Sequence, residues 1–254
     1  MLESVELIAE VLRRAIAVQP PPAPVMVALA AALAAALVLP HAVWPYTRML
    51  VTIIHEGAHG VAALLTGRRL QGIRLHSDTS GLTVSSGRPT GPGMVVMLMA
   101  GYLGPALVGL VAVFLLIAGH SLGLLWVFVI LLAVMSLQIR NLYGFALVVG
   151  CAAVLILVSW YLPPPMQSGL AYVLTWTFLL AAPKPVMELI RQRRHARTPH
   201  SDVDQLARLT RIPASLWAGG FLVVNCAGLV LGAVLLVPAL AQLGQSLAGQ
   251  LAAA

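Results

Sequence analysis

Between Pro89 and Ile139 the chain carries no Asp, Glu, Lys or Arg, a run of 51 residues. A second charge-free run extends from 141 to 183. Since a transmembrane helix needs about 20 apolar residues, each run is long enough for two spans. The chain as a whole is 60% hydrophobic and 9% charged. This composition predicts an all-α polytopic membrane protein and excludes a soluble globular domain.

The apolar runs together predict about seven transmembrane helices. Turn signals divide the two long runs, at Gly119-His120-Ser121 in the first and at the three prolines 163–165 in the second. The expected spans are 24–44, 47–66, two within 89–139, 142–162, 167–188 and 214–241. They form a single transmembrane domain over residues 24–242, with a polar loop at 189–213 and a tail at 243–254.

Residues 68–88 are the only extended stretch in which apolar and polar residues alternate. The apolar positions flank a turn-forming segment at 76–81, and they are Leu70, Ile73, Leu75, Leu82 and Val84. Alternation on both sides of a turn predicts a β-hairpin, which we expect at the membrane edge.

Residues 1–19 have helical spacing of their apolar side chains and carry three glutamates, so a cleavable signal peptide is not expected. They predict an amphipathic helix on the cytoplasmic face of the membrane. With alternating spans, fourteen basic residues fall on the side of the N-terminus and of the 189–213 loop, and only Arg48 falls on the other. The positive-inside rule therefore predicts a cytoplasmic N-terminus and an external C-terminus.

The net charge of +7 is concentrated in a few short loops between apolar runs. Basic loops next to membrane spans contact anionic lipid headgroups. The lipid bilayer is therefore the expected partner of these charges, and nucleic acid is not expected to bind.

The segment His55-Glu56-Gly57-Ala58-His59 lies inside the second predicted span. Positions i and i+4 share one face of a helix, so the two imidazoles can bind one metal ion. Glu56 can then serve as general base toward water at the metal, as in the H-E-x-x-H signature of zinc metallopeptidases. Two ordinary helix histidines beside a stray glutamate are the alternative. An ionisable residue in an apolar span is costly, which favours the site with one Zn²⁺ per chain.

With this motif the chain resembles the site-2 protease family of intramembrane zinc metallopeptidases, in particular the compact bacterial branch without a PDZ domain. The shared features are the motif at 55–59, the hairpin after it and Gly104-Pro105 in the next span. The resemblance covers about residues 45–165. It implies a bacterial plasma-membrane hydrolase that cuts a transmembrane protein substrate within or near its membrane segment. The hairpin is then expected to present a strand edge to the substrate.

Two positions depart from the family pattern. Val108 stands where the family has Asn. The family's third zinc ligand is the Asp of an N-x-x-P-x-x-x-x-D-G stretch, and here Gly144 replaces the Pro and Val149 replaces the Asp. Since valine cannot bind zinc, either another residue completes the site or the chain is a catalytically inactive, scaffold-like pseudo-protease. A transporter is a more distant alternative, because no inverted repeat is evident.

The replacement ligand should come from the predicted cytoplasmic side, toward which the motif helix runs. The oxygen and nitrogen candidates there are Asp202, Asp204, Asp78, His76, His200 and Asn141. Asp202 is the favoured ligand, although it could equally be a second helix-capping residue. Asp78 has the alternative role of a turn residue, and Asn141 that of a helix cap.

Four polar residues near the hairpin and the fifth span are candidates for substrate binding. They are Arg140, Asn141, His76 and Asp78. Arg140, at a span end, has the simpler alternative of a headgroup contact.

Overall fold

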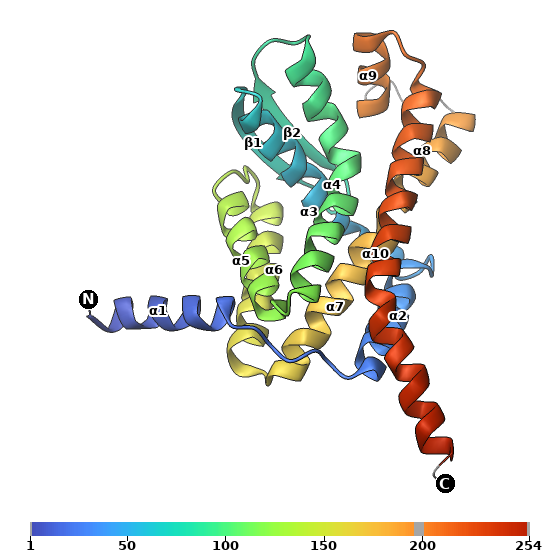
Figure 1. Ribbon diagram of the computed structural model, residues 1–254. Helices are drawn as coiled ribbons and strands as arrows, with labels where there is room; N and C mark the ends of the chain where they lie inside the picture. The colour runs from blue at the N-terminus through green and yellow to red at the C-terminus, as the bar shows by residue number, and fades with distance from the viewer. Residues whose placement is uncertain (1, 196–200, 253–254) are drawn as a thin grey trace.

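The computed structural model describes residues 2–195 and 201–252, and it is mostly helical (Figure 1). Ten helices and a two-stranded sheet follow one another along these residues. In order they are α1 (Leu2–Ile16), α2 (Pro24–Val38), α3 (Trp44–Leu65), β1 (Arg69–Leu75), β2 (Gly81–Ser86), α4 (Pro92–Ile117), α5 (Ser121–Ser136), α6 (Leu142–Tyr161), α7 (Pro164–Ala181), α8 (Pro183–His195), α9 (Asp202–Thr210) and α10 (Ala214–Ala252).

The predicted hairpin is confirmed. Strands β1 and β2 pair antiparallel, with Leu75 opposite Gly81 and Arg69 opposite Ser86. Segment 138–140 continues the sheet on the other side of β1: Ile73 N–H donates to the Gln138 carbonyl, and Arg140 N–H donates to the Ile73 carbonyl, both at 2.8 Å. One edge of β1 is therefore covered, and among the described residues β2 pairs on one side only.

Four described helical segments are long and apolar enough to cross a membrane. They are Pro92–Ile117, Leu142–Tyr161, Pro164–Arg194 and Ala214–Leu236. Helices α2 and α5 are apolar but shorter, and the polar side chains of the H-E-x-x-H motif lower the hydropathy of α3. Seven separate spans are therefore not confirmed.

The first two predicted spans do not run in opposite directions. Helix α2 runs in the same direction as α7, and its junction with α3 lies beside the start of α8: Met26 lies beside Gly169, Lys184 donates to the Val38 carbonyl, and Trp44 donates to Glu188. Helix α2 has 15 residues, or roughly 22 Å, which is too short for a hydrocarbon core of about 30 Å. Together α2 and α3 make one interrupted passage from the α1 end to the hairpin end (Figure 1).

This changes the predicted position of the N-terminus. Gln19 N–H donates to the Gly119 carbonyl at 2.8 Å, and Arg14 lies over the Trp160 ring. Helix α1 therefore lies at the end of the molecule that holds the 118–120 and 162–163 turns, opposite α9 (Figure 1). The prediction that the N-terminus shares a side with residues 189–213 is wrong, because residues 39–43 do not reverse the chain.

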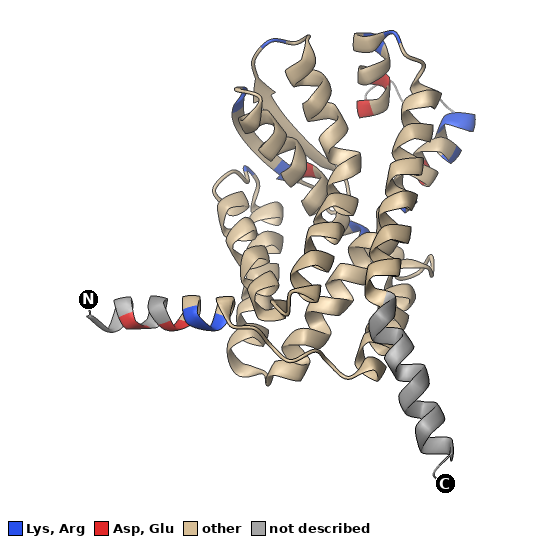
Figure 2. Ribbon diagram, viewed as in Figure 1, with Lys and Arg blue, Asp and Glu red and all other residues tan. Residues whose placement is uncertain are grey.

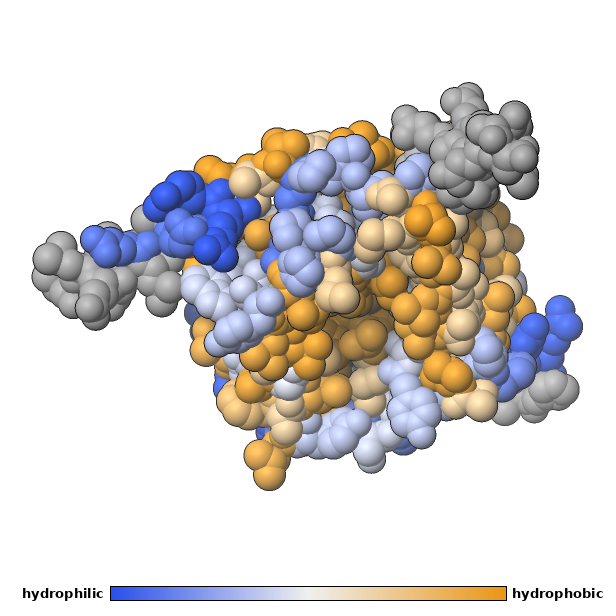
Figure 3. Space-filling model, turned by 90° about the horizontal axis from the view of Figure 1, so that it is seen from below, coloured by the Kyte–Doolittle hydropathy of each residue, from blue (hydrophilic) through white to orange (hydrophobic). Residues whose placement is uncertain are grey.

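The charged residues are also distributed unequally between the two ends of the molecule. Outside α1, most basic residues gather at the end formed by the hairpin, α8 and α9 (Figure 2). Seen from the opposite end, the molecule shows mainly apolar and weakly polar side chains, and strongly hydrophilic residues lie on α1 and at one edge (Figure 3). The large apolar core joins α2, α4, α5, α7 and α10. It supports α3 and α4, which carry the site.

Candidate metal centre

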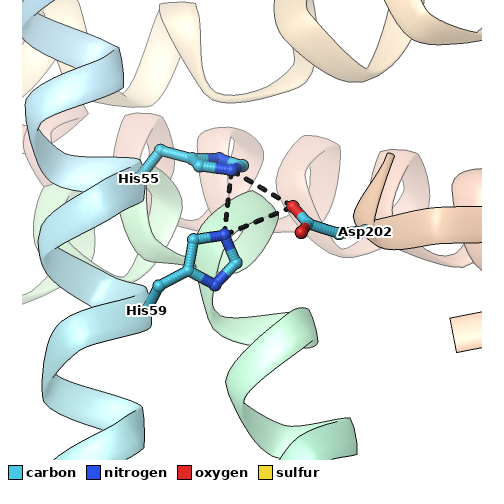
Figure 4. A group of neighbouring side chains, drawn as sticks. All are labelled: His55, His59 and Asp202. Atoms are coloured by element: carbon cyan, nitrogen blue, oxygen red, sulfur yellow. Dashed lines mark hydrogen bonds and ion pairs between the residues drawn. The ribbon is translucent and has the colours of Figure 1, made fainter. Parts of the chain in front are cut away.

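Three side chains from two distant parts of the sequence converge beside α3 (Figure 4). His55 and His59 project from one face of α3, and Asp202 projects from the start of α9. The two Nε2 atoms are 3.1 Å apart, and Asp202 Oδ2 lies 3.2 Å from His55 Nε2 and 3.3 Å from His59 Nε2. Within the described residues this is the group of three ligand-type side chains that could hold a metal ion.

The three atoms have the spacing that a zinc ion requires. In a tetrahedral site with bonds of about 2.0–2.1 Å, neighbouring ligand atoms are separated by roughly 3.3 Å. Two imidazoles and one carboxylate also match the donors of His₂-carboxylate zinc enzymes, which leave the fourth position open. The residues present therefore fit a catalytic zinc ion.

Hydrogen bonding fixes the orientation of His59. Its Nδ1 lies 2.7 Å from the Met97 carbonyl of α4. A carbonyl only accepts, so Nδ1 must carry a proton, and Nε2 is the ring nitrogen that is directed at the cluster. His55 is held by aromatic packing instead, since the Tyr102 ring meets its ring edge-on at a centroid distance of 5.0 Å. Both imidazoles are thus oriented by α4.

Helix α9 brings Asp202 to the histidines through apolar packing. Val203 and Leu206 are fully buried against side chains of α4, α8 and α10. Ser201 is the N-cap, because its hydroxyl accepts from Asp204 N–H at 3.3 Å. A cap role for Asp202 is therefore unnecessary. Burial raises the pKa of the Asp202 carboxyl, but hydrogen bonds from His55 and His59 outweigh it and hold that pKa well below its usual range.

Glu56 lies beside the cluster without belonging to it. It is 5% exposed, and one carboxylate oxygen accepts a hydrogen bond from the Thr83 hydroxyl at 2.6 Å. Glu56 and His55 both line a cavity of about 190 Å³, whose other lining residues include Arg48, Thr52, Tyr102 and Glu188. A carboxylate and an imidazole of the cluster therefore face one space that can admit a small part of a substrate.

The remaining residues predicted for the site do not reach it. Asp78 accepts from the backbone and the hydroxyl of Ser80, and His76 lies beside the same hydroxyl, so both belong to the hairpin turn. Asn141 caps nothing with its side chain; it exchanges two hydrogen bonds with the backbone of Leu75. Their predicted role in direct substrate binding has no support in these contacts.

Arg140 and Val149 also lie outside the cluster of ligand side chains that the structure describes. Arg140 bonds to the Gln71 carbonyl and packs over Gly72 beside the hairpin. Val149, at the family's ligand position, is 42% exposed on α6 and is not part of the cluster. His200 lies outside the described residues.

Sequence reasoning missed the residues that position the site from other elements. Gly101 of α4 lies directly against the two imidazoles, Thr83 of β2 holds Glu56, and Gly81 covers the same carboxylate. The pattern around Gly101 indicates only an apolar span with small residues. Thr83 is only one polar position in a predicted strand of alternating residues. No local signal links either position to the motif, because the contacts are tertiary.

We expect Gly101→Ala to disturb the metal site. A β-carbon at this position would lie 2.6 Å from His55 Nε2 and would also collide with His59 Nε2. Displaced imidazoles should weaken zinc binding by about tenfold to a hundredfold, the effect usual for changes that reorient metal ligands. Competition with a chromogenic chelator would measure the affinity.

Gly150→Ala is the matched control, because nothing lies within 4 Å of a β-carbon at that helical position. It should bind zinc as the wild type does. Equal affinity for Gly101→Ala and Gly150→Ala would contradict the proposed metal position.

Comparison with known proteins gives a family match for the chain. The family described as Peptidase M50B-like matches residues 28–232, which include α3, the hairpin and α9. No curated protein and no solved structure matches the chain. The match confirms the expected relationship to site-2 proteases and indicates a membrane-associated peptidase. Over most of its length, from α2 to α10, the chain belongs to the Peptidase M50B-like family.

Proposed function

We propose that the protein is an intramembrane zinc endopeptidase that cuts a membrane-protein substrate within or near its transmembrane segment. The observation that carries this proposal is the triangle of His55, His59 and Asp202 with Glu56 beside it. Each part of a His₂-carboxylate hydrolase is present, although the carboxylate comes from α9 and not from the family's usual helix. Because Asp202 can take the place of the family's third ligand, the valine at position 149 no longer argues for a pseudo-protease.

Each residue then has a definite role. His55, His59 and Asp202 would hold the zinc ion. When bound, zinc supplies a Lewis acid that polarises the scissile carbonyl and acidifies water. Glu56 takes the proton from the attacking water and passes it to the departing amine. Burial of Glu56 and His59, each 5% exposed, keeps bulk water away from these proton transfers.

The substrate should bind as an extended strand next to β2. A helix must unwind before its peptide bonds can be cut, and unwound backbone in a membrane needs hydrogen-bond partners. Strand β2 offers them, because its second edge has no strand partner among the described residues while the outer edge of β1 is covered by 138–140. Strand addition to β2 would place the substrate backbone near Glu56, which accepts from Thr83 of the same strand.

The hairpin end is proposed to face the bacterial cytoplasm. It carries the basic side chains of the hairpin, α8 and α9, as the positive-inside rule requires of a cytoplasmic side. Helix α1 would then lie on the opposite membrane surface. A protease-accessibility assay on sealed vesicles tests this orientation: a tag before α1 and a tag after α10 should be cut from the same side.

Metal analysis is the direct test of the proposed function. Purified wild-type protein should contain close to one zinc per chain, and His55→Ala should contain far less, because two ligands hold zinc poorly. In proteoliposomes the wild type should cut a transmembrane test substrate. A chelator should stop the reaction, and added zinc should restore it. Wild-type protein that binds no zinc would contradict the proposal.

A further inference from the structure

Strand β2 is fastened to the metal-binding helix through the proposed general base. The Thr83 hydroxyl lies 2.6 Å from Glu56 Oε2 and 3.1 Å from the Glu56 carbonyl oxygen, and it is the donor to both. On the other side of the carboxylate, a β-carbon at Gly81 would lie 2.6 Å from Oε1. Two residues of one strand therefore confine the Glu56 side chain.

A second hydroxyl fixes the start of the strand to the same helix. Thr52, one helical turn before Glu56, donates to the Thr79 carbonyl at 2.9 Å. The hairpin turn and the first residues of β2 are thus held in place against α3. Leu82 and Val84, the neighbours of Thr83, are 51% and 39% exposed, as strand alternation requires when Thr83 faces the helix.

We propose that Thr83 is a positioning residue, which holds Glu56 in its reactive orientation and transmits to it the pairing of a substrate strand on β2. This inference rests on the proposed function. Glu56 has three side-chain torsions, whereas a β-branched threonine has a stiff χ1 torsion that the strand backbone orients. A substrate that pairs with β2 makes the strand backbone more rigid, and the Thr83 hydroxyl passes this restraint to the carboxylate. The base is then best ordered when a substrate is present.

A purely structural role for the bond would make different predictions. If Thr83 only anchored the hairpin, its loss would lower stability, substrate affinity and turnover together. A positioning role instead lowers kcat while KM and zinc content stay unchanged. The two roles therefore separate in kinetic and metal measurements.

The test compares Thr83→Val, Thr83→Ser and Thr175→Val in detergent-purified full-length protein. Valine keeps the shape and strand preference of threonine but cannot donate, so Thr83→Val should fold and should lower kcat by roughly tenfold to a hundredfold with KM and zinc content unchanged. Thr83→Ser keeps the hydroxyl and should restore most of the rate. Thr175→Val removes a fully buried hydroxyl that bonds within α7 and should leave kcat unchanged.

A binding measurement decides the inference even if no substrate is cut. A short peptide hydroxamate can bind the metal of the zinc-loaded protein, and Glu56 can accept the hydroxamate proton. Its Kd should rise about tenfold in Thr83→Val and stay near the wild-type value in Thr83→Ser. Wild-type affinity and kcat in Thr83→Val would overturn the inference. Zinc and hydroxamate binding without any cleavage would instead count against the proposed function alone.

Discussion

Glu56→Gln is expected to keep zinc and lose peptide-bond cleavage. The amide has nearly the shape of the carboxylate and can still accept a hydrogen bond from Thr83, but it cannot take a proton from the attacking water. A positioned general base contributes roughly a hundredfold to ten-thousandfold to the rate. The turnover of a transmembrane test substrate in proteoliposomes should fall by that factor, while zinc per chain, measured by elemental analysis, stays at the wild-type value.

Glu10→Gln is the control for the loss of one glutamate charge. Glu10 pairs with Arg13 and Arg14 on the surface of α1, far from the cavity, so this variant should cut at the wild-type rate. A Glu56→Gln variant that still cuts at nearly the wild-type rate would exclude Glu56 as the base. A variant that lost zinc as well would assign Glu56 to the metal site instead of to proton transfer.

The elements of the fold that local signals specify could be predicted from the sequence. Charge-free runs indicated the apolar helices, the prolines at 163–165 indicated the break between α6 and α7, and alternation around 76–81 indicated the hairpin. Each signal acts over a few residues: proline lacks a donor, and alternating side chains suit a half-buried strand. These features do not depend on contacts with distant parts of the chain.

The path of the first passage could not be predicted in the same way. An apolar run shows that a segment prefers lipid, but not whether it crosses alone or continues into the next helix. Helix α2 is too short to cross by itself, and its junction with α3 is stabilised by Lys184 and Glu188 of α8, which lie 146 and 144 residues further along the chain than their partners. The charge count assumed that every run crosses, and this assumption placed α1 at the wrong end.

The candidate site also contains residues that could be predicted from the sequence and residues that could not. His55, Glu56 and His59 follow from helical periodicity within one helix. Asp202 was favoured because it lies on the side toward which α3 runs, just before a segment with an apolar face of its own. The structure places its carboxylate against both imidazoles. Gly101 and Thr83 were not predicted, because their importance depends on the approach of α4 and β2 to α3. That Asp202 binds zinc stays a prediction.

The prediction for Asp202 has the largest expected effect on metal binding. Asp202→Ala should lower zinc affinity at least a hundredfold, more than the tenfold to hundredfold loss usual for residues that only support a ligand. The two histidines would be left as neutral ligands without an anionic partner. Asp204→Ala is the matched control on the same helix: Asp204 pairs with Arg193 and Ser201, so its loss should weaken the start of α9 by about 1 kcal/mol while zinc stays bound.

A cysteine at each position would distinguish direct ligation from a general weakening of α9. Thiolate is a good ligand for Co²⁺ and Zn²⁺, so cobalt-loaded Asp202→Cys should show a thiolate-to-cobalt charge-transfer band. Asp204→Cys should not, because Asp204 points to Arg193 and not to the histidines. Native Cys151 and Cys226 are present in both variants and cannot cause a difference between them. The same spectrum for both variants would mean that position 202 does not bind the metal, because only a residue within bonding distance of the ion can place its sulfur in the coordination sphere.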